Sequence, residues 1–225
     1  MTGTTPDESG PVGVPRPGPA DLDVGSWQPW TPVQLAHRLA GVDVPWWVCG
    51  GWALELFHRD AGAGPLRAHA DLEFGICRDD FPAVRPALLA DPHHELYLAG
   101  DGQLWPLGTD QDPPDEFAQV WTYDGGVGAF RTDTFLDPGS RRQWVCKRDA
   151  RLVRPLADTI ARDRDGVPYQ RPEVVLLMKA KHARDKDRAD LAATLPLLPV
   201  PAREWLAAAL RLVHPGHGWI AAVDG

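Results

Sequence analysis

The sequence is poor in cysteine, has no long apolar run and holds fewer basic than acidic residues, and each shortage excludes a class of protein. Its three cysteines are far apart and form neither a CxxC pair nor a zinc-ligand spacing, so we expect buried thiols in a reducing cytoplasm. No apolar run approaches the roughly 20 residues of a membrane-spanning helix, and the N-terminal segment lacks the basic start and apolar stretch of a secretory signal. The net charge of −8 argues against nucleic acid as a partner, because a nucleic-acid binder presents a basic face.

The remaining composition is typical of an ordinary folded domain. Hydrophobic residues make up 44% and charged residues 24% of the 225 residues, enough for one large domain or one domain with a smaller appendage. Residues 1–24 are rich in proline, glycine, threonine and aspartate and are predicted to be a disordered tail. Strands and helices are mixed over residues 25–155, and residues 156–225 are predicted to form a C-terminal helical subdomain. The predicted fold class is therefore α+β, a mixed β-sheet with flanking helices followed by helices alone.

Hydrophobic periodicity, capping residues and turn residues predict the individual elements. The predicted helices span Pro32–Ala40, Trp52–Phe57, Asp79–Leu89, Pro172–Lys181, Lys186–Leu195 and Pro201–Val213. The predicted strands span Val44–Cys49, His69–Cys77, Glu95–Ala99, Gln103–Leu107, Ala118–Tyr123, Gly128–Phe135 and Gln143–Lys147.

A pair of glycines, Gly50 and Gly51, lies between a predicted strand and the predicted helix that begins at Trp52. Glycine lets backbone amides approach a ligand closely, and a helix start offers free N–H groups and the positive end of the helix dipole. A phosphate group would be favoured there. A tight structural turn is the alternative interpretation, and the glycine pair alone does not separate the two.

Two carboxylates, Asp71 and Glu73, lie two residues apart on a predicted strand and are expected to project from the same face. Carboxylates held side by side repel unless cations lie between them, and magnesium takes oxygen ligands and also holds substrate phosphates. Two such ions about 4 Å apart stabilise the attacking and leaving oxygens of an in-line displacement. A solvated strand face is the alternative.

A third carboxylate is expected from Asp133, in the middle of a predicted strand and close to two phenylalanines. A carboxylate next to an apolar core needs a partner, which a metal ion or an ion pair with Arg131 would supply. As a general base, Asp133 would take the proton of an attacking hydroxyl. Asp137 is the competing candidate, but the proline and glycine that follow it predict a turn.

These residues form an ordered series of motifs that resembles a known family. The series is GGW at 50–52, RAHADLE at 67–73, the strand aspartate Asp133, YQRPE at 169–173, KAK at 179–181 and KDRADL at 186–191. It resembles the polymerase-β-like nucleotidyltransferase superfamily and is nearest to the aminoglycoside and lincosamide nucleotidyltransferases of antibiotic resistance. The resemblance covers most of the chain from about Trp46 to Leu195.

The resemblance implies the nucleotidyltransferase type of mixed sheet and a magnesium-dependent reaction. A nucleoside monophosphate would pass from ATP or another nucleoside triphosphate to a hydroxyl of a small molecule, such as an aminoglycoside-like or lincosamide-like antibiotic, with release of pyrophosphate. By position, two Mg²⁺ ions would be held by the catalytic residues Asp71, Glu73 and Asp133. The residues that would bind the nucleotide are Gly50, Gly51, Arg67, His69 and Lys179.

Several positions leave an alternative open. Glu73 stands where many relatives have aspartate, and this departure motivates a second hypothesis, a degenerate fold that binds a ligand or partner without catalysis. Independently of this, His69 would serve equally well to orient Asp71, and Lys179 to complement the C-terminal end of a helix. Asp187 and Asp190 lie three residues apart on a predicted helix, which favours a solvated or salt-bridged face over a site for substrate amines.

Overall fold

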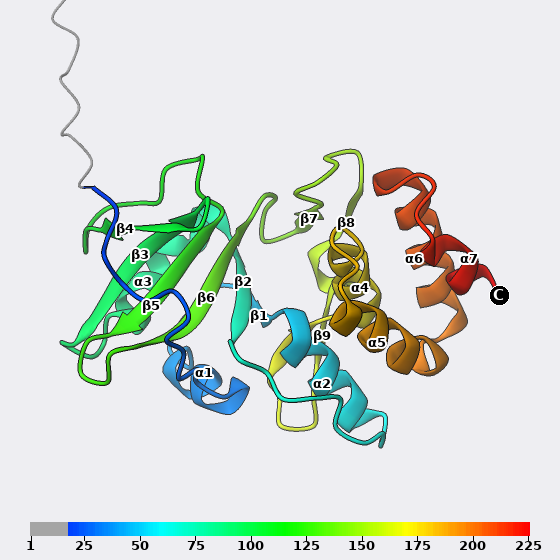
Figure 1. Cartoon of the computed structure of the whole chain (residues 1–225), viewed down its shortest axis with the longest axis horizontal. Helices are drawn as coiled ribbons and strands as arrows, with labels where there is room; N and C mark the ends of the chain where they lie inside the picture. Colours follow the sequence, from blue (N-terminus) through cyan, green and yellow to red (C-terminus); the bar gives the residue numbers. More distant parts are fainter. Residues whose placement is uncertain (1–17) are drawn as a thin grey trace, which may run out of the picture.

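The structure, a computed structural model, describes residues 18–225 and is built around an eight-stranded mixed β-sheet (Figure 1). The strand order is β4-β3-β5-β6-β2-β1-β10-β9. Strand β2 runs parallel to β6 and β1 runs parallel to β10, whereas the other neighbours are antiparallel. The strands span Trp46–Val48 (β1), Glu73–Cys77 (β2), His94–Gly100 (β3), Gln103–Leu107 (β4), Gln119–Asp124 (β5), Ala129–Asp137 (β6), Ile160–Arg162 (β9) and Pro168–Gln170 (β10).

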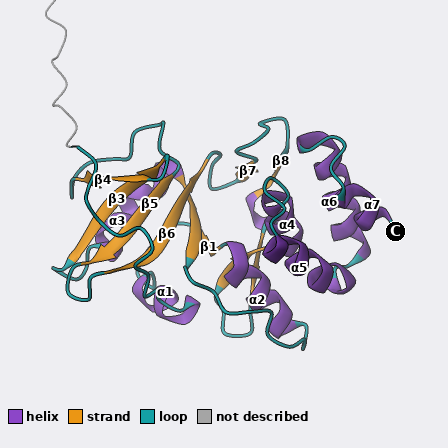
Figure 2. Ribbon diagram, in the orientation of Figure 1, coloured by secondary structure: helices purple, strands orange, loops and turns teal. Residues whose placement is uncertain are grey.

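The C-terminal helices gather beside the sheet rather than on it (Figure 2). Helix α2 lies between the two regions, because it contacts β2 and β10 on one side and α4 and α5 on the other. A second, two-stranded sheet pairs Gln143–Val145 (β7) with Val153–Pro155 (β8). The helices span Pro32–Arg38 (α1), Gly50–Asp60 (α2), Phe81–Leu88 (α3), Pro172–Lys179 (α4), Asp185–Thr194 (α5), Val200–Val213 (α6) and Trp219–Asp224 (α7). The predicted α+β class, a mixed sheet followed by C-terminal helices, is confirmed.

Local signals account for the elements that the sequence predicts well. Helix α1 begins at Pro32 because the Thr31 hydroxyl accepts from the N–H of Gln34 and the Gln34 side chain accepts from the N–H of Thr31. Strand β4 has the predicted bounds. The prediction misses β8, β9, β10 and α7, since three-residue strands and a six-residue helix are too short to show a period.

The start of β2 differs from the prediction, because the strand begins at Glu73 and not at His69. Its neighbour β1 pairs with only three residues of β2, and β6 pairs with β2 from Glu73 onward. Without a partner strand, the preceding chain bends at Ala70 and Asp71. The expectation that Asp71 and Glu73 alternate along one strand is therefore wrong.

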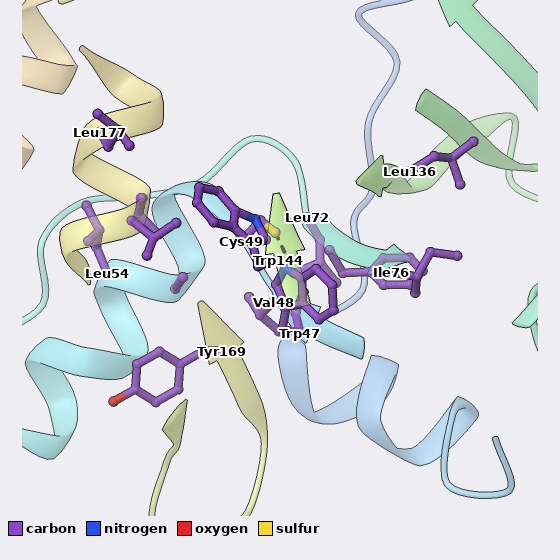
Figure 3. Packing of buried hydrophobic residues seen from close by; sticks show 14 of the residues in the cluster. Trp47, Val48, Cys49, Leu54, Leu72, Ile76, Leu136, Trp144, Tyr169 and Leu177 are labelled. Carbon is purple, nitrogen blue, oxygen red and sulfur yellow. Dashed lines mark hydrogen bonds between the residues drawn. The ribbon is translucent and has the colours of Figure 1, made fainter. Parts of the chain in front are cut away.

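One apolar core runs from the sheet into the C-terminal helices (Figure 3). Trp47 and Ile76 on two neighbouring strands belong to the same buried cluster as Leu54 of α2 and Leu177 of α4. Burying a leucine or isoleucine side chain contributes about 1.5–3 kcal/mol. This shared packing fixes α2 and α4 relative to the sheet, and with them the side chains at their ends.

The expected division of the chain is only partly covered by the structure. Of the predicted tail, residues 1–17 lie outside the described residues, whereas the N–H of Ala20 donates to the carbonyl of Leu104 at 2.7 Å and Leu22 packs on an aromatic cluster of the sheet. Strands β9 and β10 follow residue 155 but belong to the main sheet, so the all-helical part begins at Pro172. The division into 25–155 and 156–225 stays a proposal. Over residues 18–225 no helix is long and apolar enough to cross a membrane.

Candidate functional site

The glycine turn opens helix α2, and its first residue has a backbone that favours glycine. Gly50 has a φ of +59°, and a Cβ there would lie 1.6 Å from Oε2 of Glu73. The turn is tied to β2, because the N–H of Cys49 donates to the carbonyl of Glu73 at 2.8 Å. The Glu73 carboxylate therefore lies directly against the N-terminus of α2, where the helix dipole favours negative charge.

The side chains of Arg67 and His69 fold over the second glycine. A Cβ at Gly51 would lie 2.5 Å from Nδ1 of His69 and 2.9 Å from Nη2 of Arg67. The His69 ring packs on Trp52, with 4.8 Å between ring centroids, and its Nε2 lies 3.4 Å from Oε2 of Glu55. Burial and the nearby Arg67 lower the pKa of His69. Both predicted nucleotide-lining residues thus lie at the glycine turn, and the partner of His69 is Glu55, which the sequence did not single out.

Glu73 and Asp133 are brought side by side. They are register partners on the parallel strands β2 and β6. Asp133 is 5% exposed, and its Oδ2 accepts from Nε2 of Gln119 at 2.6 Å, whereas its Oδ1 is buried and has no hydrogen-bond partner within the described part of the chain. Burial and the nearby Glu73 raise the pKa of the Asp133 carboxyl well above its usual range. Burial together with repulsion from Glu73 therefore makes the ionised form of Asp133 costly.

Asp71 lies outside this pair, in the exposed bend before β2. It is still close enough to act electrostatically on Glu73. Burial is the main cause of the raised pKa of Glu73, and the charge of Asp71 is the next. Among residues 18–225, no group of three or more histidine, cysteine, aspartate or glutamate side chains is already gathered as a metal site. The donor atoms are nevertheless of the type that magnesium binds, because Glu73 and Asp133 offer carboxylate oxygens. One of these oxygens, Oδ1 of Asp133, is buried without a hydrogen-bond partner in the described residues.

A cavity of about 530 Å³ opens beside Gly50 and Glu73. Five lysine or arginine side chains line it against two carboxylates, although the whole chain is acidic. A concave basic surface at a helix N-terminus suits a polyanion such as a triphosphate. The cationic lining residues are Lys147, Arg148, Lys179, Lys181 and Arg184, and the lining carboxylates are Glu73 and Asp137.

Three residues of this cavity were not expected from the sequence. Asp137 is the buried last residue of β6 and not a turn residue, and its Oδ1 lies 3.8 Å from Nζ of Lys147. Burial raises the pKa of Asp137, and Lys147 partly offsets the effect. Residues 133, 135 and 137 alternate onto one strand face, so the same period that selects Asp133 also selects Asp137. Lys147 and Arg148 follow a three-residue strand and carry no periodic signal.

Lys179 lies at the end of α4 and lines the cavity, but buried aspartates of α5 hold it. Its Nζ lies 3.1 Å from Oδ1 of Asp187 and 2.9 Å from Oδ2 of Asp190. Asp190 also accepts two hydrogen bonds from Arg67, at 3.1 and 3.2 Å, and Asp187 accepts one from Nε of Arg184 at 2.8 Å. Burial acts to raise the pKa of Asp187, but Arg184 and Lys179 outweigh it and lower the pKa to about 2. Of the two alternatives for this helix face, the salt-bridged one is correct.

Comparison with known proteins finds similar solved structures, including the following two, and no sequence relative. No family model matches the chain, and a search of curated proteins finds no match. The solution structure of the antibiotic-resistance factor ANT(2'')-Ia has 14% identity and a TM-score of 0.48, over 85% of this chain and 94% of that chain. The crystal structure of ANT(2'')-Ia in complex with adenylyl-2''-tobramycin has 11% identity and a TM-score of 0.47, over 80% of this chain and 97% of that chain. Similarity of this degree concerns the arrangement of the chain and assigns no role to any residue.

Proposed function

We propose that the protein transfers a nucleoside monophosphate from a nucleoside triphosphate to a hydroxyl of a small molecule, with magnesium, and releases pyrophosphate. One observation carries the proposal. Asp133, with one unpartnered buried oxygen, is the register partner of Glu73, and Glu73 lines a basic cavity together with Gly50. Buried carboxylates without positive partners are costly, and a bound cation together with a polyanionic substrate would satisfy both sides of the cavity.

The phosphates would bind on the basic side of the site. The N–H groups at Gly50 and Gly51 begin α2, and free N–H groups at a helix start favour a phosphate. Arg67, His69 and Lys179 would contribute side chains around them. Arg148 and Lys181 also line the cavity, and neither has a carboxylate within ion-pair distance in the described residues. These cations would orient the triphosphate and stabilise the charge that grows on the leaving pyrophosphate.

Asp71, Glu73 and Asp133 would hold magnesium, which when bound neutralises phosphate charge and lowers the pKa of an attacking hydroxyl. Asp133 would take the proton of the acceptor hydroxyl at Oδ1, while Gln119 keeps Oδ2 in place. The acceptor oxygen forms a bond to the α-phosphorus, and the bond from that phosphorus to the bridging oxygen breaks. Pyrophosphate then leaves with the electron pair of the broken bond.

The acceptor class follows from the sequence motifs, which resemble those of aminoglycoside and lincosamide nucleotidyltransferases. We therefore propose a hydroxylated antibiotic of one of these classes as the acceptor, and the cytoplasm, which supplies triphosphate and magnesium, as the place of action. A second candidate is ligand binding without catalysis. It is favoured by the position of Asp71 in an exposed bend outside the strand.

The test is a screen of triphosphates against hydroxylated antibiotics for magnesium-dependent release of pyrophosphate. We expect release with one acceptor class, and loss of release in Asp71→Asn because a ligand of magnesium is removed. The control is Asp158→Asn, an exposed aspartate that does not line the cavity. Unchanged turnover in Asp71→Asn contradicts the assignment. Triphosphate binding without release from any acceptor, and insensitive to Asp71→Asn, favours the second candidate.

A further inference from the structure

Two cations that reach the candidate site come from distant parts of the chain and meet at one carboxylate. Arg67 belongs to the loop before β2, and Lys179 ends α4, yet both contact Asp190 of α5. Arg67 and Asp190 are 123 positions apart in the sequence. The Asp190 side chain is only 2% exposed, so its charge is directed inward at these two groups and not at solvent.

The neighbouring Asp187 does not duplicate this arrangement. It contacts Lys179 and Arg184 but makes no hydrogen bond or ion pair with Arg67 in the described residues. Asp190 alone therefore links the loop that covers Gly51 to the helix end that lines the cavity. Both oxygens of its carboxylate are used, one toward Nε and one toward Nη2 of the same guanidinium, which fixes the orientation of that group as well as its position.

Stability alone gives a weak reason for such a cluster. The cost of removing charges from water offsets most of the attraction in a buried ion pair, and apolar residues of similar volume often stabilise a fold as well. An apolar residue at this position would pack, but it would not hold a guanidinium over a glycine turn and an ammonium at the rim of a cavity at the same time.

We propose that Asp190 is a positioning residue, which holds Arg67 and Lys179 in the places where they meet the phosphates of a nucleoside triphosphate. The inference rests on the proposed function, because it names the group that organises the same site. Without Asp190, Arg67 loses its carboxylate partner and Lys179 keeps its contact with Asp187 alone of the two aspartates, so both side chains gain rotational freedom, Arg67 the more. Ordering them again lowers the binding free energy of the triphosphate.

The experiment is a calorimetric titration of the full-length protein with ATP and magnesium, or with the triphosphate that the release screen selects. The variants are Asp190→Asn, Arg67→Gln and the double variant. Asp185→Asn is the matched control, because this aspartate is on the same helix and its side chain is 99% exposed. We expect each single variant to weaken triphosphate binding by about tenfold or more, since hydrogen bonds to charged groups are worth roughly that factor. The double variant should lose less than the sum of the two single losses, because Asp190 and Arg67 share one interaction while Asp190 also acts on Lys179.

A purely structural role predicts a different pattern. In that case the melting temperature of Asp190→Asn falls while its triphosphate affinity matches wild type, and this result overturns the proposal. Additive losses in the double variant overturn it as well, because they mean that Asp190 acts independently of Arg67. If Asp190→Asn does not fold, the titration is made with Asp190→Glu, which keeps the charge but displaces both cations. Weakened binding then supports the proposal, and unchanged binding overturns it. Failure of the proposed function is distinguishable, because wild type itself then binds no triphosphate.

Discussion

Replacing Asp133 by asparagine should stabilise the metal-free protein while abolishing its activity. The carboxylate of Asp133 is buried beside that of Glu73, and its Oδ1 has no partner in the described residues. Asparagine keeps the shape of the side chain, removes the charge and lets an amide N–H point toward Glu73. The change therefore relieves repulsion in the fold and removes the proposed general base.

The size of the effect follows from the strand geometry. Neighbouring strands are about 4.8 Å apart. Two ionised carboxylates at about 5 Å, with an effective dielectric constant of about 20, repel by about 3 kcal/mol. Protonation relieves part of this repulsion, because the pKa of Asp133 is raised by burial and by Glu73. We therefore expect Asp133→Asn to raise the free energy of unfolding by about 1–3 kcal/mol near neutral pH.

The sign of the pH dependence is also fixed. A carboxyl whose pKa is higher in the folded than in the unfolded state destabilises the fold as pH rises from about 4 through the folded pKa. Wild type without metal should lose stability over this window, and Asp133→Asn should lose less. Urea unfolding across this range, with and without magnesium, measures both effects, and Asp158→Asn is the exposed control. Magnesium should stabilise wild type more than the variant. A variant that is less stable than wild type without metal, and that gains as much from magnesium, would refute the reasoning.

Two further changes test the surroundings of this pair. Gly50→Ala should cost about 1–2 kcal/mol of unfolding free energy for the left-handed backbone and should also lose activity, because its Cβ displaces the Glu73 carboxylate. Gly62→Ala has a similar φ of +70° with no atom within 4 Å, so urea unfolding and turnover assays should show the same cost in stability and full activity. Gln119→Leu removes the hydrogen bond that lowers the pKa of Asp133, so the acidic limb of the pH–rate profile should move to higher pH and kcat should fall. An acidic limb that stays in place would show that Asp133 is not the titrating base.

The fold was predictable where an element is long enough to show its own period. The helix at Pro32 and the strand Gln103–Leu107 carry caps or alternation that need no tertiary information. The start of β2 was not predictable in this way, because the alternating residues before Glu73 have no strand beside them to pair with. The alternating pattern therefore extends through Asp71, although the strand begins only at Glu73. An alternating residue pattern shows that a segment can form a strand, whereas pairing with neighbouring strands decides whether it does.

The sequence singles out two acidic residues of the candidate site, Glu73 and Asp133, but places Asp71 in a strand, assigns Asp137 to a turn and misses most of the cationic side chains. The fold places Glu73 and Asp133 in register. The positions of Arg67 and Lys179 depend on Asp190, and no local pattern connects residues that are 123 positions apart. Lys147 and Arg148 enter the cavity only because a short two-stranded sheet carries them there.

The charge of the whole chain and the charge of its cavity differ in sign, and this difference limits the ligand. A net charge of −8 repels a long polyanion that must lie on the protein surface. A small polyanion can instead enter the cavity, which five cationic side chains line. Two carboxylates, those of Glu73 and Asp137, line the same cavity, and the buried Asp133 lies beside Glu73 on the next strand. A bare triphosphate would be attracted by the cationic side chains and repelled by the carboxylates. A bare metal ion would be attracted by the carboxylates and repelled by the cationic side chains. A triphosphate that carries its own magnesium presents both charges, which supports the proposed use of the complex rather than of either part.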